Sequence, residues 1–341
     1  MMPVHVIAGP LGVGKTTVLS YLLANKPPEQ NWVVLMNEFS EAGIDALTVA
    51  SAARGAYDVR LLAGGCLHCS GEQDFQRTLG ELIDRVQPDR VLVEPSGIGH
   101  PAGIVDGLLG FEARGDIRLE GVVALIDPVR LLAGEAERPG TLRDGLEIAD
   151  AVALTRAASA SPAELHAFEV LVATMVPAKR WHGAIEAGAL PLAALQAGVG
   201  ESRRERGLPG HAHWATTSKA SVGEAIATIG GERINASHID FTGASWRFPR
   251  AIEFIGEALQ LALGGLYAGN SATLAPPLRL KAVLRVAEDR WLLWQHDGSR
   301  SEVRESSWRR DSRIEVIHSP GTRVDWRHWD QFWSQCQARP A

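Results

Sequence analysis

One eight-residue segment near the start of the chain places the strongest constraint on its fold. The segment reads Gly9-Pro10-Leu11-Gly12-Val13-Gly14-Lys15-Thr16 and matches the pattern G-x-x-x-x-G-K-[ST] in full. It directly follows an apolar run over residues 4–8 and precedes a helical pattern over 17–24. Glycines at these positions let backbone N–H groups turn around a phosphate, and the lysine reaches the β- and γ-phosphate oxygens. The segment therefore predicts a P-loop for a nucleoside triphosphate, with the Thr16 hydroxyl as a Mg²⁺ ligand and Thr17 also at the nucleotide.

Short apolar runs alternate with amphipathic stretches through the first half of the chain. The runs cover residues 4–8, 32–36, 59–62, 90–94, 122–126 and 151–154. Their near-continuous hydrophobicity is typical of strands that helices cover on both faces. The pattern predicts an α/β fold with a doubly wound, mostly parallel P-loop NTPase sheet.

The sequence becomes polar and loop-like over residues 201–218, which predicts a linker. We therefore expect domains at 1–200 and 219–341. After the linker the patterns predict a strand over 237–246, a helix over 249–263, strands over 278–286, 290–296 and 313–317, and a last helix from Asp325. The second domain is accordingly expected to be a smaller C-terminal α+β domain.

Composition excludes several classes of function. The 341 residues carry a net charge of −6 with no basic block, so no nucleic-acid partner is expected. The longest apolar run, near residues 258–268, is too short and too rich in glycine to span a membrane. No signal peptide fits the first residues. Three cysteines, two of them close together, suit a reducing compartment, so a cytoplasmic protein is expected.

The apolar run over residues 90–94 ends in a carboxylate and resembles a Walker B strand. Glu94 closes the run, and Gly97 follows three residues later. At the carboxyl edge of a parallel sheet Glu94 would face the P-loop and orient Mg²⁺ or the attacking water, and the Gly97 N–H would sense the γ-phosphate. The alternative is a glutamate that only caps the following turn. We predict catalytic roles for Lys15, Glu94 and Gly97.

The segment after the second apolar run is acidic. It reads Asn37-Glu38-Phe39-Ser40-Glu41-Ala42-Gly43-Ile44-Asp45 and occupies the place of a switch loop in this topology. Carboxylates near the phosphates indicate metal contact, and we rank Asp45, as a Mg²⁺ ligand, and Glu38 ahead of Glu41. The alternative for each is a solvated side chain.

Two thiols and an imidazole follow the third apolar run. The segment is Gly64-Gly65-Cys66-Leu67-His68-Cys69. Thiolates and imidazole suit Zn²⁺, and a tetrahedral site needs a fourth ligand, for which Glu38 and water are the candidates. A redox-active dithiol and a structural turn with incidental thiols are the alternatives.

These motifs, in this order and at this spacing, resemble those of the CobW family of metal-binding P-loop GTPases. The quoted motifs include Glu94-Pro95-Ser96-Gly97-Ile98-Gly99-His100-Pro101, and Leu280-Lys281-Ala282-Val283-Leu284-Arg285 is similar to the strand that opens the family's C-terminal domain. The resemblance implies a GTPase that binds zinc and delivers it to a client protein. It places Cys66 and Cys69 at thiol positions of a C-x-C-C element whose middle cysteine is His68 here. A homo-oligomer is compatible with the sequence.

The chain departs from the family at the guanine motif. Where the family has N-K-x-D or T-K-x-D, this chain has Thr155-Arg156-Ala157-Ala158. We retain Thr155 and Arg156 among the nucleotide-binding residues. The aspartate that would accept two hydrogen bonds from guanine is missing, which removes on the order of 1–3 kcal/mol of base selectivity.

The leading hypothesis is a zinc-binding GTPase that acts as a metallochaperone. In this hypothesis γ-phosphate contacts order the acidic loop, which shares space with Cys66, His68 and Cys69, so that hydrolysis exposes the metal. One alternative is a sensor or adaptor that binds metal or nucleotide without turnover, which the sequence at 155–158 favours. Another is a P-loop ATPase or kinase for a small molecule, which gives the cysteines no role.

Overall fold

The computed structural model describes most of the chain. The described residues are 1–37, 46, 48–49, 57–62, 72–95, 101–134, 136, 141–175, 178–199, 221–222, 225–238, 241–269, 271, 273–296, 301–306, 310–319 and 322–338. They divide between two compact units, each with its own sheet. The linker expected over 201–218 lies outside the described residues, so the boundaries at 200 and 219 stay a prediction.

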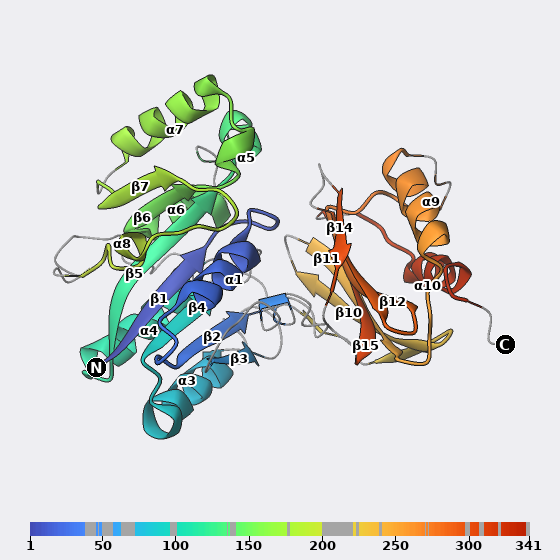
Figure 1. The fold of residues 1–341 in the computed structure, drawn as a ribbon, viewed down its shortest axis with the longest axis horizontal. Coiled ribbons are helices and arrows are strands. Elements are labelled where there is room, and N and C mark those ends of the chain that lie inside the picture. Colours follow the sequence, from blue (N-terminus) through green and yellow to red (C-terminus); the bar gives the residue numbers. More distant parts are fainter. Residues whose placement is uncertain are drawn as a thin grey trace. The chain divides into compact units, whose positions relative to one another are not determined.

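The first unit is built on a parallel sheet of seven strands in the order β3-β2-β4-β1-β5-β6-β7 (Figure 1). The strands are β1 (Met2–Ala8), β2 (Trp32–Asn37), β3 (Tyr57–Leu62), β4 (Arg90–Glu94), β5 (Ile117–Ile126), β6 (Ala151–Leu154) and β7 (Trp181–Ala184). Every neighbouring pair in this order is parallel. The expected doubly wound parallel sheet is therefore confirmed.

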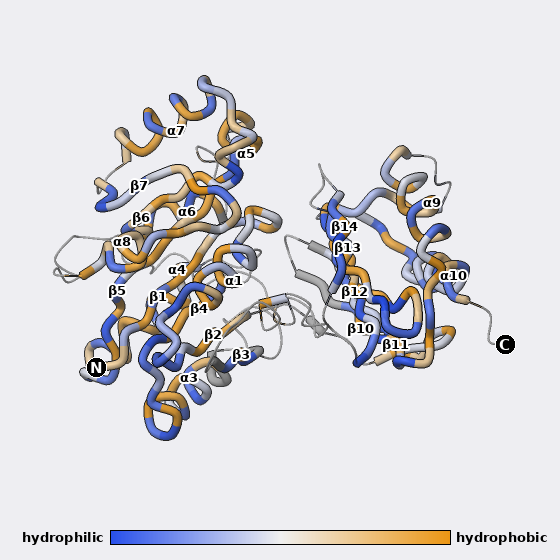
Figure 2. Tube along the Cα trace, viewed as in Figure 1, coloured by the Kyte–Doolittle hydropathy of each residue, from blue (hydrophilic) through white to orange (hydrophobic). Residues whose placement is uncertain are grey.

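Helices connect these strands. They are α1 (Lys15–Asn25), α3 (Glu72–Glu81), α4 (Pro101–Ala113), α5 (Pro128–Leu132), α6 (Thr141–Ile148), α7 (Pro162–Thr174) and α8 (Leu192–Leu195), with a π-helical turn η2 (Leu82–Val86) and a 3-10 turn η3 (Ala157–Ser159). Apolar residues of α3, α4, α6 and α7 form one core with alternate residues of the strands, among them Val4 and Val6. In Figure 2 β6 is hydrophobic along its length, as expected for a strand covered on both faces.

A buried histidine on β1 shows how α8 packs on the opposite face of the sheet. His5 is fully buried, and its Nδ1 lies 2.8 Å from the carbonyl oxygen of Leu195. Arg90 donates to Nε2, so the ring proton sits on Nδ1 and the imidazole is neutral. Burial, with Arg90 as the next cause, lowers the pKa of His5 from 6.5 to about 3.

The second unit is an antiparallel sheet in the order β14-β13-β12-β15-β11-β10-β8, with β9 paired to β10 (Figure 1). Its strands are β8 (Ser221–Val222), β9 (Ile226–Thr228), β10 (Gly231–His238), β11 (Phe241–Pro249), β12 (Arg279–Ala287), β13 (Arg290–His296), β14 (Ser301–Glu305) and β15 (Asp311–His318). Helices α9 (Gly256–Tyr267) and α10 (Trp326–Gln335) share a core with this sheet. The expected smaller α+β domain is confirmed.

Several predicted elements of the second unit have different bounds. The strand expected over 237–246 is two strands, because His238 of β10 pairs with Phe241 of β11 and the chain reverses there. The helix expected over 249–263 begins only at Gly256. Pro249 still pairs with Asp311 in the sheet, and the chain then makes a turn in which the backbone N–H of Ile252 donates to the carbonyl oxygen of Pro249 at 3.0 Å.

Four strands, β7, β8, β9 and β14, were not expected from the sequence at all. Strand β7 reads Trp-His-Gly-Ala, with too few apolar residues for a strand pattern. Strand β14 is exposed and mostly hydrophilic (Figure 2), with Val303 as its one apolar residue. Both lie at an edge of their sheet, where one side of the strand has no neighbour to bury it.

Candidate nucleotide site

The P-loop, residues 9–16, joins the end of β1 to the start of α1. Gly9, Gly12 and Gly14 have φ angles of 151°, 76° and 103°, a region that side chains with a Cβ atom rarely adopt. A Cβ atom on Gly9 would lie 2.9 Å from Val13 Cγ1 and 3.0 Å from the carbonyl oxygen of Leu125. The conformation of this loop therefore requires the glycines of the motif.

Lys15 and Glu94 lie close together at the carboxyl edge of the parallel sheet. Strands β1 and β4 are parallel neighbours, so the loops that follow them meet at this edge. The Lys15 ammonium donates to the carbonyl oxygens of Gly9 at 3.0 Å and Pro10 at 3.3 Å, and it lies 3.8 Å from the Glu94 carboxylate. Both side chains are less than a tenth exposed. A cation and a carboxylate are thus held beside the P-loop, with little solvent screening.

The two residues after β6 donate hydrogen bonds to the backbone of the P-loop. The Thr155 hydroxyl donates to the carbonyl oxygen of Val13 at 2.8 Å, and Arg156 Nη2 donates to that of Gly12 at 2.8 Å. Thr155 is buried, and Arg156 has a left-handed φ of 57°. The two residues that we assigned to the nucleotide site are therefore in contact with the P-loop backbone.

Arg130 is a P-loop contact that the sequence did not suggest. Asp127, directly after β5, caps α5 by accepting from the backbone N–H of Arg130 at 2.9 Å. The guanidinium of Arg130 lies 3.3 Å from the same carboxylate and donates to the carbonyl oxygen of Leu11. The Asp127-Pro128 pair is a helix-start signal that predicts α5, but the pattern carries no sign of the contact with Leu11.

The loops after β6 and β7 are joined to each other. The backbone N–H of Ala157 donates to the carbonyl oxygen of Ile185 at 3.2 Å, and that of Ala158 donates to the Glu186 carboxylate at 2.7 Å. Glu186 was missed by the sequence reasoning because β7, which positions it, was not expected.

The remaining predicted site residues divide into two groups. Thr16 and Thr17 lie in the first turn of α1, Thr16 half-buried and Thr17 exposed. The others lie outside the described residues: Glu38, Asp45, Cys66, His68, Cys69 and Gly97. Among the residues that the structure describes, no group of three or more His, Cys, Asp or Glu side chains could hold a metal ion.

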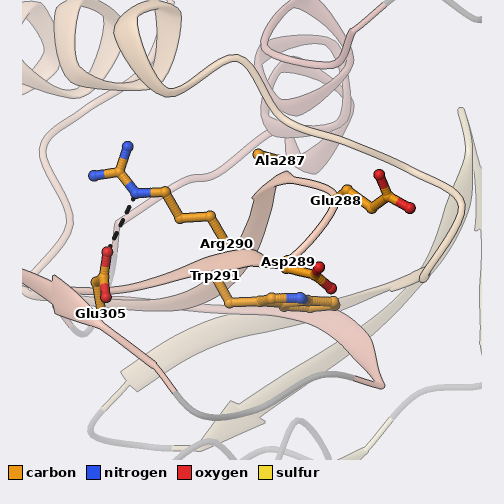
Figure 3. Close-up of a pocket in the computed structure, with 6 residues that line it drawn as sticks. All are labelled: Ala287, Glu288, Asp289, Arg290, Trp291 and Glu305. Atoms are coloured by element: carbon orange, nitrogen blue, oxygen red, sulfur yellow. Dashed lines mark ion pairs between the residues drawn. The ribbon is translucent and has the colours of Figure 1, made fainter.

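A pocket of about 440 Å³ lies on the second unit, at the turn between β12 and β13 (Figure 3). It is lined by Ala287, Glu288, Asp289, Arg290, Trp291 and Glu305. Arg290 pairs with Glu305 across it at 3.4 Å. The pocket contains none of the predicted site residues.

Across the described ranges no helix has the length and hydrophobicity needed to cross a membrane.

Comparison with known proteins identifies the family. A family model described as CobW/HypB/UreG, nucleotide-binding domain, matches residues 3–182, which is more than half of the chain. The chain belongs to this family. The matched span begins within β1 and ends within β7, so it contains the P-loop, Glu94, Thr155 and Arg156.

Relatives of the CobW/HypB/UreG family differ in how much of the chain they match. The chain is 28% identical to the zinc chaperone YeiR of Escherichia coli K12 over 96% of this chain and 95% of YeiR. It is 30% identical to the zinc chaperone YjiA of the same strain, over 55% of this chain and 60% of YjiA. The crystal structure of Zn(II)-bound YjiA GTPase from E. coli is similar at 16% identity, over 99% of both chains, with a TM-score of 0.43.

Proposed function

We propose that this chain is a GTPase that binds zinc and passes it to a zinc-dependent client protein in the cytoplasm. The observation that carries the proposal is the buried pair of Lys15 and Glu94, 3.8 Å apart beside the P-loop. Membership of the CobW/HypB/UreG family supports the nucleotide-binding part. The zinc part is supported by the cysteine and histidine cluster and by the names of the relatives YeiR and YjiA.

The P-loop fits a triphosphate. The positive φ angles of the glycines disfavour side chains along the loop, and Leu125 lies too close to Gly9 for a Cβ atom there. Lys15 then supplies a cation for the β- and γ-phosphate oxygens, and the α1 N-terminus supplies backbone N–H groups. Bound Mg²⁺ neutralises phosphate charge, and Thr16 with Asp45 is the proposed donor set for it.

Glu94 is the proposed residue for hydrolysis. Glu94 is 7% exposed and lies on the same edge of the sheet as the P-loop. In this position it orients the water that attacks the γ-phosphate, and the backbone N–H of Gly97 senses that phosphate.

Zinc is the proposed cargo of the protein. Cys66, His68 and Cys69 provide two thiolates and an imidazole, and Glu38 is the proposed fourth ligand. The cluster follows β3 and the acidic loop follows β2, and β2 and β3 are parallel neighbours. Because parallel neighbours end at the same edge, a loop ordered by the γ-phosphate would share space with the zinc ligands.

The second candidate is a protein that binds nucleotide or metal without turnover. It is favoured by Ala158, which offers no carboxylate where the family's guanine motif has one.

Hydrolysis of GTP and ATP, measured side by side with and without one equivalent of zinc, tests the proposal. Turnover of GTP that responds to zinc is expected. Absence of turnover with both nucleotides would favour the silent binding protein, and zinc-independent turnover of ATP with phosphate transfer to a small molecule would favour a kinase.

A further inference from the structure

Glu186 brings a carboxylate next to position 158, where the guanine motif of this chain has an alanine in place of an aspartate. It lies two residues beyond the end of β7, and its Oε2 accepts a hydrogen bond from the backbone N–H of Ala158 at 2.7 Å. Strands β6 and β7 are parallel neighbours, so Leu154 lies opposite Ala184 and the two following loops leave the sheet together. The Glu186 carboxylate is therefore fixed against the backbone of residue 158.

The loop that carries Glu186 also packs on the first turn of α1. Gly188 has a φ of 79°, and a Cβ atom on it would lie only 2.5 Å from the carbonyl oxygen of Thr17. The loop after β6 contacts the P-loop through Arg156 and Gly12. Glu186 is thus tied to the P-loop region by two separate routes.

The distance from Glu186 to the P-loop matches the length of a nucleotide. In the strand order β1-β5-β6-β7, three strand spacings separate the end of β1 from the end of β7. Three spacings amount to about 14 Å, the scale of a nucleotide from its phosphates to the far edge of its base. A base whose phosphates lie in the P-loop reaches the region of Ala158 and Glu186.

We propose that Glu186 reads the base of the nucleotide and selects guanine in place of the aspartate missing at position 158. This proposal rests on the nucleotide site proposed above. A carboxylate has about four acceptor positions, of which the Ala158 N–H occupies one. Guanine presents two donors side by side, its N1–H and its 2-amino group, whereas adenine presents an acceptor at N1. Glu186 accepts from guanine and repels adenine.

The competing explanation is that Glu186 only fixes the loop after β6. The variant Glu186→Gln separates the two, because a glutamine oxygen still accepts from the Ala158 N–H while the charge is lost. In xanthine a carbonyl oxygen replaces the 2-amino group of guanine, so the glutamine amide can donate where the carboxylate accepted. A structural role does not predict any change in preference between these bases.

Calorimetric titration of the full chain with Mg²⁺ and guanosine, xanthosine or adenosine diphosphate tests the proposal. For Glu186→Gln we expect guanosine diphosphate to bind about tenfold more weakly and xanthosine diphosphate to bind more tightly, where tenfold corresponds to about 1.4 kcal/mol. Adding Ala158→Asp to this variant should restore the preference for guanosine. Glu169→Gln is the matched control, since Glu169 is an exposed carboxylate that pairs with His182 of β7 at 3.1 Å.

Two results would overturn the proposal in distinguishable ways. If the nucleotides bind but Glu186→Gln leaves the ratio of guanosine to xanthosine affinity as in the wild type, Glu186 does not read the base and the nucleotide site stands. If no diphosphate binds the wild-type chain, the proposed function fails and the role of Glu186 fails with it.

Discussion

Arg156 donates a hydrogen bond of 2.8 Å to the carbonyl oxygen of Gly12, so the residue after Thr155 holds the backbone of the P-loop. The family position that elsewhere carries a lysine of the guanine motif is therefore joined to the P-loop backbone in this chain. The contact involves the loop backbone and is independent of the base.

Arg156→Ala should weaken the binding of GTP and ATP equally. One half-buried hydrogen bond from a charged donor contributes about 1 kcal/mol, or about fivefold in Kd. Titration with both nucleotides measures this, with Arg143→Ala as the control, since Arg143 pairs with Glu147 on the surface of α6. A loss confined to GTP would show that Arg156 acts on the base.

Lys15→Ala should abolish hydrolysis, because it removes the cation that we propose contacts the phosphates and that lies 3.8 Å from Glu94. Release of inorganic phosphate at saturating GTP is the measurement. Lys26→Ala is the matched control at the other end of α1, where the ammonium donates to the carbonyl oxygen of Gln30. Turnover retained by Lys15→Ala would place the active site elsewhere.

Gly9→Ala should lower the free energy of unfolding by about 1–3 kcal/mol, because the new Cβ meets Val13 and Leu125 and the φ of 151° disfavours a side chain. Gly110→Ala in α4, where a Cβ meets nothing within 4 Å, should instead stabilise by up to about 1 kcal/mol. Urea unfolding of both variants measures these changes in the free energy of unfolding. Equal midpoints would mean that the loop relaxes around the methyl group.

The sequence predicted those elements whose pattern is local and apolar. The strands at 90–94 and 151–154 have the bounds expected of them, because each is a buried run with both faces covered. The start of α10 was equally readable, since Asp325 caps it by accepting from the backbone N–H of Arg327. Edge strands such as β7 carry little hydrophobic signal and were missed.

Most contacts at the candidate site could not be predicted from the sequence, because they depend on the order of the strands in the sheet. The sequence placed Glu94 at the edge of the sheet, and the structure brings it within 3.8 Å of Lys15, although its role in hydrolysis stays a prediction. Arg130 and Glu186 could not be predicted, because their partners, Leu11 and Ala158, are set by tertiary packing and not by spacing along the chain.

Cys66→Ala should lower zinc affinity and remove its dependence on the bound nucleotide, since one of the two proposed thiolate ligands is lost. Competition with a zinc-chelating dye, with and without GTP, measures both effects. Cys336→Ala is the control, because burial raises the pKa of that thiol to about 11 and keeps it protonated. Unchanged zinc binding in Cys66→Ala would refute the coupling of zinc to nucleotide.

The stability of the first unit should fall as the pH decreases below 6.5. His5 has a pKa of about 3 in the folded chain and 6.5 when unfolded, so between these values only the unfolded state takes up its proton. Between these two pKa values the free energy of unfolding falls by about 1.4 kcal/mol per pH unit on this account, and the loss ends near pH 3. Urea unfolding between pH 7 and 5 should show a shallower pH dependence for His5→Gln than for the exposed control His166→Gln; equal slopes would contradict a neutral, buried His5.

The P-loop motif is complete once residue 16 has been synthesised, but the side chains that hold its carbonyl oxygens come 119, 142 and 144 residues after their partners. A nascent chain that has emerged only as far as β5 carries the whole motif without Thr155 or Arg156 to support it. Such long-range contacts form late, because the intervening chain must fold before they can close. The three side-chain contacts to the P-loop can thus be complete only once the chain has been synthesised through residue 156.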